Sequence, residues 1–276
     1  MSGTQISRYR EVWELFVLNR FCLLSPQKKG KYLMKKFNSL FFIFLWLIYM
    51  GGADAAVPDA QIIGPLEADP PGHPSRNSIY AASAIELSSN GYVEEEYFIE
   101  GTANQYTNPT LETGAIVDSN HRYLTRLIVR RPQAENYNGT VIVEWINVTG
   151  GPDKDIDWWY SGSHFMRNGY AYVAVSAQQM GIDTMKEWSP ERYGHLDVTH
   201  DGMVDRDALS YDIFSAVGKA INRIGQSTPA DRVDILDGLK AEVIIATGHS
   251  QSASRLAIYL NNIHPLEPIL DGVMVH

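Results

Sequence analysis

The serine between a predicted strand and a predicted helix is the side chain in this sequence best placed to do chemistry. The segment reads Gly248-His249-Ser250-Gln251-Ser252, after the apolar run VIIAT and before a helical pattern over residues 252–263. A serine at the apex of such a sharp turn projects its Oγ above the sheet, and small residues two positions before and after it let the two backbones approach. The sequence therefore predicts that Ser250 is a nucleophile. The alternative is that Ser250 only caps the helix.

Two groups could stabilise an oxyanion formed at Ser250. The turn presents the backbone N–H of Gln251 at the positive end of the following helix. The second donor in this arrangement comes from the loop after the third strand, which reads Asn147-Val-Thr-Gly150-Gly151-Pro152. Gly150 and Gly151 would allow a backbone N–H to turn toward the site. The alternative is that they serve only the geometry of the turn.

The elements that must position these groups follow an alternating pattern of strands and helices. Two strands with alternating or β-branched residues come first, and four largely apolar runs follow, as in parallel strands buried on both faces. The predicted strands cover 91–100, 123–131, 140–146, 171–176, 243–247 and 269–275, and the predicted helices cover 157–168, 208–224 and 252–263. This order predicts an α/β fold with an open, mostly parallel, doubly wound sheet, two leading antiparallel strands and an end at about the sixth strand.

These features together resemble the α/β-hydrolase fold, and in particular little-characterised bacterial α/β-hydrolase domain proteins. The resemblance rests on the elbow GHSQSASRLAIYLN, the Gly-Gly loop in NGTVIVEWINVTGG, and stretches such as EYFIEGTANQY, LIVRRP, GYAYVAVSAQ, RYGHL, SYDIF and DGVMVH. It implies a serine hydrolase that acts on a small-molecule carboxylic ester through an acyl-enzyme on Ser250, without a cofactor.

The general base has the weakest support in the sequence of any member of the predicted site. In this fold the acid and the histidine are expected on later loops than this chain contains. His276 follows the last predicted strand, whose end should lie at the same sheet edge as Ser250, so it is a candidate base. No acid is obviously placed to orient it. We therefore expect a C-terminally incomplete hydrolase with weak or no activity; the alternative is a non-catalytic remnant or binding protein with a partial hydrolase fold.

The N-terminal residues are typical of an export signal. The apolar run from Leu40 to Met50 is eleven residues long, follows two lysines and precedes the small-residue pattern Ala53-Asp54-Ala55. Eleven residues are too few to span a bilayer, so no stable span is expected after cleavage, and an uncleaved membrane anchor is the alternative. We predict a leader over 1–55 with Met34 as the true start and cleavage after Ala55, a Pro-rich linker over 56–76, and a hydrolase domain over 77–276 in a secreted or periplasmic protein.

Composition excludes several other classes of site. Residues 56–276 carry 15 Lys and Arg against 29 Asp and Glu, so we expect no nucleic-acid partner. The only cysteine, Cys22, lies in the leader, which removes thiol nucleophiles and cysteine-ligated metals. The segment from His195 to Asp201 could supply metal ligands but is more simply a polar loop. Glu94, Glu95 and Glu96 are expected on a solvated face or an edge strand, and Trp158 and Trp159 in the core or a pocket wall.

Overall fold

The computed structural model describes residues 57–276, apart from residue 111 and residues 227–230. Every described residue lies in one compact unit of the chain, the domain within residues 53–276. The predicted signal sequence therefore falls outside the described residues. Across 57–276, without residues 111 and 227–230, no helix is long and apolar enough to cross a membrane.

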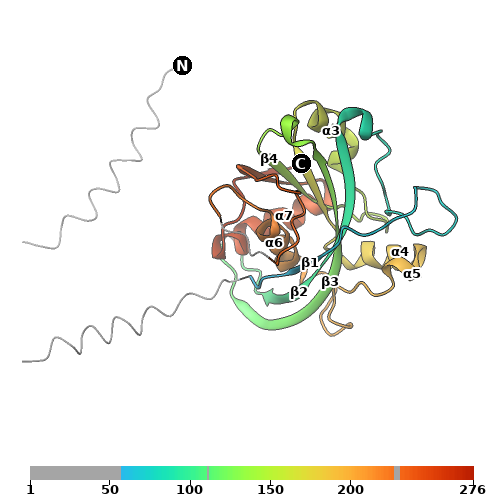
Figure 1. Cartoon of the computed structure of the whole chain (residues 1–276). Helices are drawn as coiled ribbons and strands as arrows, with labels where there is room; N and C mark the ends of the chain where they lie inside the picture. The colour runs from blue at the N-terminus through green and yellow to red at the C-terminus, as the bar shows by residue number, and fades with distance from the viewer. Residues whose placement is uncertain (1–56, 111, 227–230) are drawn as a thin grey trace, which may run out of the picture. The chain divides into compact units, whose positions relative to one another are not determined.

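A mixed seven-stranded sheet organises the domain (Figure 1). Its spatial order is β1-β2-β3-β5-β4-β6-β7, with antiparallel pairing from β1 through β3 to β5 and parallel pairing from β5 through β4 and β6 to β7. The strands are β1 (Gln61–Ile63), β2 (Tyr92–Tyr106), β3 (Ile116–Pro132), β4 (Thr140–Trp145), β5 (Ala171–Val175), β6 (Val243–Gly248) and β7 (Gly272–Val275). The six strands predicted from sequence are all present, and the predicted α/β architecture is confirmed.

The seventh strand, β1, lies inside the segment expected to be a linker. Gln61, Ile62 and Ile63 pair with Glu100, Ile99 and Phe98 of β2. Ile62 points into the core, and Val57 is also buried. Five prolines in residues 57–76 prevent a regular helix, but they leave room for this short antiparallel edge strand.

Helices cover both faces of the sheet. Helix α3 (Ile156–Arg167) packs Trp158, Phe165 and Met166 against one face. On the other face lie α4 (Gln179–Trp188), α6 (Ser210–Ala220) and α7 (Gln251–Asn262), with Ile182, Phe214 and Leu256 among the side chains in their shared core. The short helix α5 is Pro190–Tyr193, and the 3₁₀ turns are η1 (Ser88–Asn90), η2 (Ala134–Asn136) and η3 (His264–Leu266).

Two of these helices depart from the sequence-based expectation. Helix α6 ends at Ala220 rather than near 224, because Ile221 is extended and Arg223 forms a bridge with Ala241. Helix α4 was not predicted, since its sequence QMGIDTMKEW has only a narrow apolar stripe and contains a glycine. Gly181 is needed there because a Cβ at this position would overlap the carboxylate of Asp153.

The expectation that Glu94 to Glu96 form a solvated face is wrong. Glu96 is fully buried and forms ion pairs with Arg126 at 3.1 Å and Arg192 at 2.6 Å. Glu94 pairs with the buried Arg130 at 2.6 Å. These partners come from β3 and α5, far along the chain, so the charges are buried as compensated pairs rather than exposed.

Candidate active site

Ser250 occupies the turn between β6 and α7, as predicted. Strand β6 ends at Gly248 and helix α7 begins at Gln251. Ser250 itself has φ 54° and ψ −110°, a sparsely populated backbone conformation for a residue with a Cβ. Its side chain is exposed. The chain therefore holds this serine on a strained bend above the carboxyl edge of the parallel strands.

Small residues on either side make the tight turn possible. A Cβ at Gly248 would lie 3.0 Å from the backbone carbonyl carbon and oxygen of Ser252. Ser252 is fully buried, and its Oγ accepts a hydrogen bond from the His249 N–H at 3.1 Å and donates one to the His249 carbonyl at 2.9 Å. Ser252 thus does more than replace a second glycine, because its hydroxyl holds both backbone groups of His249, the residue just before Ser250.

The loop after β4 contacts the same turn. Asn147 donates from Nδ2 to the His249 carbonyl at 2.8 Å and accepts at Oδ1 from the Thr149 N–H at 2.9 Å. Gly150 and Gly151 have φ values of 82° and 111°, which favour glycine, as the predicted loop requires. The Gly151 N–H already donates to the Val148 carbonyl at 3.0 Å, whereas Gly150 lines the adjoining cavity.

His276 reaches the same sheet edge and has an acidic partner that the sequence did not reveal. Its Nε2 lies 2.7 Å from Oδ1 of Asp157, at the start of α3. The Asp157 carboxylate is buried, and its other oxygen accepts from Thr247 Oγ1 at 2.7 Å. Sequence reasoning looked for an acid after Ser250, whereas this one precedes it by almost a hundred residues. The fold, not the chain order, brings them together.

The imidazole of His249 also lies beside His276. Their Nδ1 atoms are 3.3 Å apart, and their ring centroids are 5.0 Å apart in an edge-to-face arrangement. The Ser250 N–H donates to the His276 carbonyl at 2.7 Å, so the backbones of the two residues are neighbours. Within the described part of the chain, no hydrogen bond joins Ser250 Oγ to either imidazole.

A buried carboxylate on β4 positions the acid. Glu144 accepts from the backbone N–H of Asp157 at 3.1 Å and from Tyr172 Oη at 2.5 Å. It therefore accepts from an otherwise unpaired donor at the N-terminus of α3. Burial, with a smaller effect from the charge of Asp157, raises the pKa of Glu144 well above its usual range.

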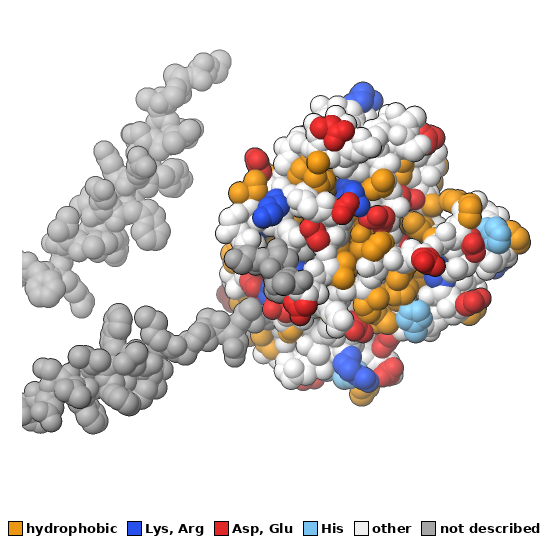
Figure 2. Space-filling view, viewed as in Figure 1, with side chains coloured by type: hydrophobic (Ala, Val, Ile, Leu, Met, Phe, Trp, Pro, Cys, Tyr) orange, Lys and Arg blue, Asp and Glu red, His pale blue; other side chains and the backbone are white. Residues whose placement is uncertain are grey.

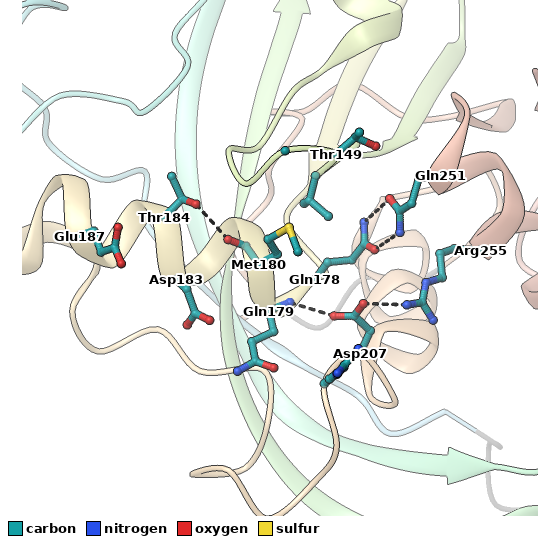
Figure 3. Close-up of a pocket in the computed structure, with 13 residues that line it drawn as sticks. Thr149, Gln178, Gln179, Met180, Asp183, Thr184, Glu187, Asp207, Gln251 and Arg255 are labelled. Atoms are coloured by element: carbon teal, nitrogen blue, oxygen red, sulfur yellow. Dashed lines mark hydrogen bonds and ion pairs between the residues drawn. The ribbon is translucent and has the colours of Figure 1, made fainter.

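A cavity of about 650 Å³ opens beside Gln251 (Figure 3). Figure 3 shows the side chains of Gln178 and Gln251 facing each other, with Asp207 between the start of α4 and Arg255. Gln178 and Gln251 exchange two side-chain hydrogen bonds, and Arg255 pairs with Asp207 at 2.8 Å. Sequence reasoning missed Gln178 and Asp207, which lie between elements, and Arg255 on α7, because isolated polar residues carry no pattern that reveals their partners.

The remaining candidates lie elsewhere. Trp158 is buried in the core as expected, but Trp159 is exposed. Over the described residues, no group of three or more His, Cys, Asp or Glu side chains is placed to hold a metal ion, the segment from His195 to Asp201 included.

Comparison with known proteins agrees with the fold. The model of the alpha/beta hydrolase domain family matches residues 63–276. Among solved structures the chain is similar to acetyl xylan esterase 1 from Thermoanaerobacterium sp. JW/SL YS485, with 14% identity and a TM-score of 0.31 over 70% of this chain and 50% of that one. The chain thus spans about half the length of that structure. No curated protein matches it. Because the family model covers well over half of its residues, the chain belongs to the alpha/beta hydrolase domain family.

Proposed function

We propose that this protein is a serine ester hydrolase that forms an acyl-enzyme on Ser250. The observation that carries this proposal is the backbone of Ser250, held at φ 54° and ψ −110° between β6 and α7. Strain of this kind persists only where surrounding contacts impose it. Here the side chains of Asn147 and Ser252 form hydrogen bonds with the backbone N–H and carbonyl of His249, the residue before Ser250. A serine that only capped α7 would not need this conformation, and its side chain makes no capping hydrogen bond.

In the first half-reaction, Ser250 Oγ attacks the ester carbonyl while its proton passes to His276. Because Nε2 of His276 faces Asp157, Nδ1 is the nitrogen that takes this proton. Nδ1 must then exchange its 3.3 Å contact with His249 for one with Ser250. Catalytic hydrogen bonds are often formed only in the substrate complex, so the unliganded geometry is compatible with this role.

The new bond carries negative charge to the former carbonyl oxygen. The Gln251 N–H at the start of α7 and an N–H of the loop after β4 are the proposed donors to that oxyanion. Gly150 is the better placed of the two glycines, because the Gly151 N–H is used within the loop. The carbon–oxygen bond to the alcohol then breaks, and the alcohol leaves with the proton from His276.

In the second half-reaction, water hydrolyses the acyl-enzyme. His276 takes a proton from the water, the hydroxide adds to the acyl carbon, and Ser250 leaves with the proton restored to Oγ. Asp157 stabilises the imidazolium that forms on His276 in each half-reaction. The acid released has the acyl group of the ester.

Turnover of p-nitrophenyl acetate by the wild-type chain and by Ser250→Ala tests this function. We expect release of p-nitrophenol to depend on Ser250. The rate of the variant should lie between the rate in buffer alone and about 10³–10⁴ times that rate, which is the residual catalysis that binding and an oxyanion site can supply. Equal rates in the two proteins would instead favour a non-catalytic binding protein with the same fold.

We also propose that the protein is exported, on the basis of the apolar run from Leu40 to Met50 and the small residues that follow. The exported form should begin at or near Ala56. N-terminal sequencing of periplasmic or secreted material checks this, and recovery of an intact Met1 in the cytoplasm would contradict it.

A further inference from the structure

We propose that Gln178 is a positioning residue, which holds the Gln251 side chain and through it the backbone N–H that receives the oxyanion. This inference rests on the proposed function. Gln178 follows the carboxyl end of β5, at the same end of the parallel strands as Ser250 after β6. Its role depends on three hydrogen bonds made by one buried amide.

The first of these bonds ties Gln178 to the strand that separates it from the nucleophile. In the sheet, β4 lies between β5 and β6. The Gln178 Nε2 donates to the carbonyl of Ile146, just past the end of β4, at 3.0 Å. The amide is therefore fixed to the backbone next to the loop that carries Gly150, and only 1% of Gln178 is exposed.

The other two bonds reach across to the turn after β6. Gln178 Nε2 donates to Gln251 Oε1 at 3.3 Å, and Gln251 Nε2 donates to Gln178 Oε1 at 2.5 Å. Figure 3 shows this closed pair at the wall of the cavity. One side chain thus links the ends of three adjacent strands, and it leaves Gln251 few rotamers.

Gln251 is the residue whose backbone orientation matters most for the oxyanion. It is the first residue of α7 and follows the strained Ser250, so a small rotation here redirects its N–H. On the other side of Ser250, Asn147 holds the His249 carbonyl at 2.8 Å. The two residues that flank the nucleophile are each held by a side-chain amide from a neighbouring loop.

Stability alone does not account for this pair. Replacing both partners of a buried hydrogen bond by apolar groups of the same shape can be nearly neutral for folding. The paired amides instead fix the orientation of Gln251. This matters because its backbone N–H must lie within hydrogen-bond distance of the oxyanion. We therefore assign to the pair a role in the geometry of catalysis in addition to the packing of the buried Gln178.

A double-mutant cycle on the full chain tests this role. Gln178→Met, Gln251→Met and the double variant are compared with wild type in p-nitrophenyl acetate hydrolysis, with far-UV circular dichroism to check folding. We expect each single variant to lower kcat by about 10–100-fold with KM nearly unchanged, since the lost interaction acts only in the transition state. The double variant should be no slower than the singles, because both substitutions remove the same pair.

Gln105→Met is the matched control. Gln105 on β2 is a half-buried glutamine whose amide lies 3.0 Å from His121 Nε2, and it is not part of the site. It should keep the wild-type kcat even if it unfolds more easily. If Gln178→Met does not fold, Gln251→Met carries the same test from the other side of the pair.

The outcomes separate this inference from the proposed function. A wild-type chain without Ser250-dependent turnover overturns both. If turnover depends on Ser250, three results overturn only the role of Gln178. These are a wild-type kcat in Gln178→Met, a change in KM alone, and additive losses of kcat in the double variant.

Discussion

Asp157 and His276 are the pair on which proton transfer at Ser250 would depend. The Asp157 carboxylate is buried. One of its oxygens accepts a hydrogen bond from Thr247 Oγ1, and the other faces His276 Nε2. A carboxylate in this position selects the tautomer of His276 whose Nδ1 is free to accept a proton. Orientation of the imidazole is therefore the function we assign to Asp157.

Replacing Asp157 with Asn should reverse that selection. An amide N–H facing Nε2 would place the ring proton on Nδ1, which then cannot take the proton of Ser250. We expect kcat for p-nitrophenyl acetate to fall by about 10²–10⁴-fold, as when the acid of a triad is neutralised. The control is Asp201→Asn, which removes an exposed ion pair with Arg122 and should keep wild-type rates. An Asp157→Asn variant within about threefold of wild type would contradict the assignment, a difference of under 1 kcal/mol in the barrier.

At the scale of elements, the junction of β6 and α7 determines the geometry of the site. Gly248 must be small because the backbone of Ser252 passes so close to it. Gly272, at the start of the neighbouring β7, has room for a methyl group instead, since the nearest atom to a Cβ at that position would be on Ile245, at the ordinary contact distance of 3.8 Å. Neither glycine has a positive φ, so backbone strain does not separate the two positions.

Gly248→Ala should therefore separate α7 from β6, while Gly272→Ala should not. We expect Gly248→Ala to lower the free energy of unfolding by about 1–3 kcal/mol, the usual range for overpacking, and to lower kcat as the Ser250 turn shifts. Urea denaturation and ester turnover measure the two effects. Equal stability and turnover in the two alanine variants would show that the turn tolerates the extra carbon.

The elements differ in how far the sequence predicts them. The strand-turn-helix at Ser250 was predictable because an apolar run abuts a helical pattern with no loop residues between them. Strand β1 was not, since its three residues lie among prolines and become a strand only by pairing with β2. The acid on α3 was missed for a different reason: proximity between Asp157 and His276 arises from the parallel order of β4, β6 and β7, which no local pattern contains.

At the scale of the whole molecule, charge is distributed without a basic surface on the face in view. Figure 2 shows Lys and Arg side chains scattered singly among Asp and Glu on that face. In the interior, burial raises the pKa values of three carboxyl groups, those of Glu144, Asp153 and Asp212. At pH values between its ordinary pKa and its raised pKa, such a group binds more protons in the folded state than in the unfolded chain.

Asp212 gives the clearest pH dependence. Burial raises its pKa to about 6, against 3.8 for an ordinary aspartate, although Tyr106 and Asn104 donate hydrogen bonds to it. The folded state therefore binds more protons than the unfolded state between these values, so stability is highest below about pH 4 for this group and falls as pH rises to about 6. The full loss is on the order of 2–3 kcal/mol.

Asp212→Asn should remove that part of the pH dependence. We expect the free energy of unfolding of wild type, relative to the variant, to fall between pH 4 and pH 7. Urea denaturation at both pH values measures this difference. Parallel pH profiles of the two proteins would show that Asp212 is not protonated on folding.

The nucleophile itself can be tested directly by mass spectrometry after reaction with a fluorophosphonate. Ser250 Oγ should form a bond to phosphorus, with loss of fluoride and transfer of the hydroxyl proton to His276. We predict one adduct on the wild-type chain, located at Ser250 in the peptide map, and none on Ser250→Ala. An unmodified wild-type chain, or an adduct that persists in Ser250→Ala, would contradict the assignment of Ser250 as the nucleophile.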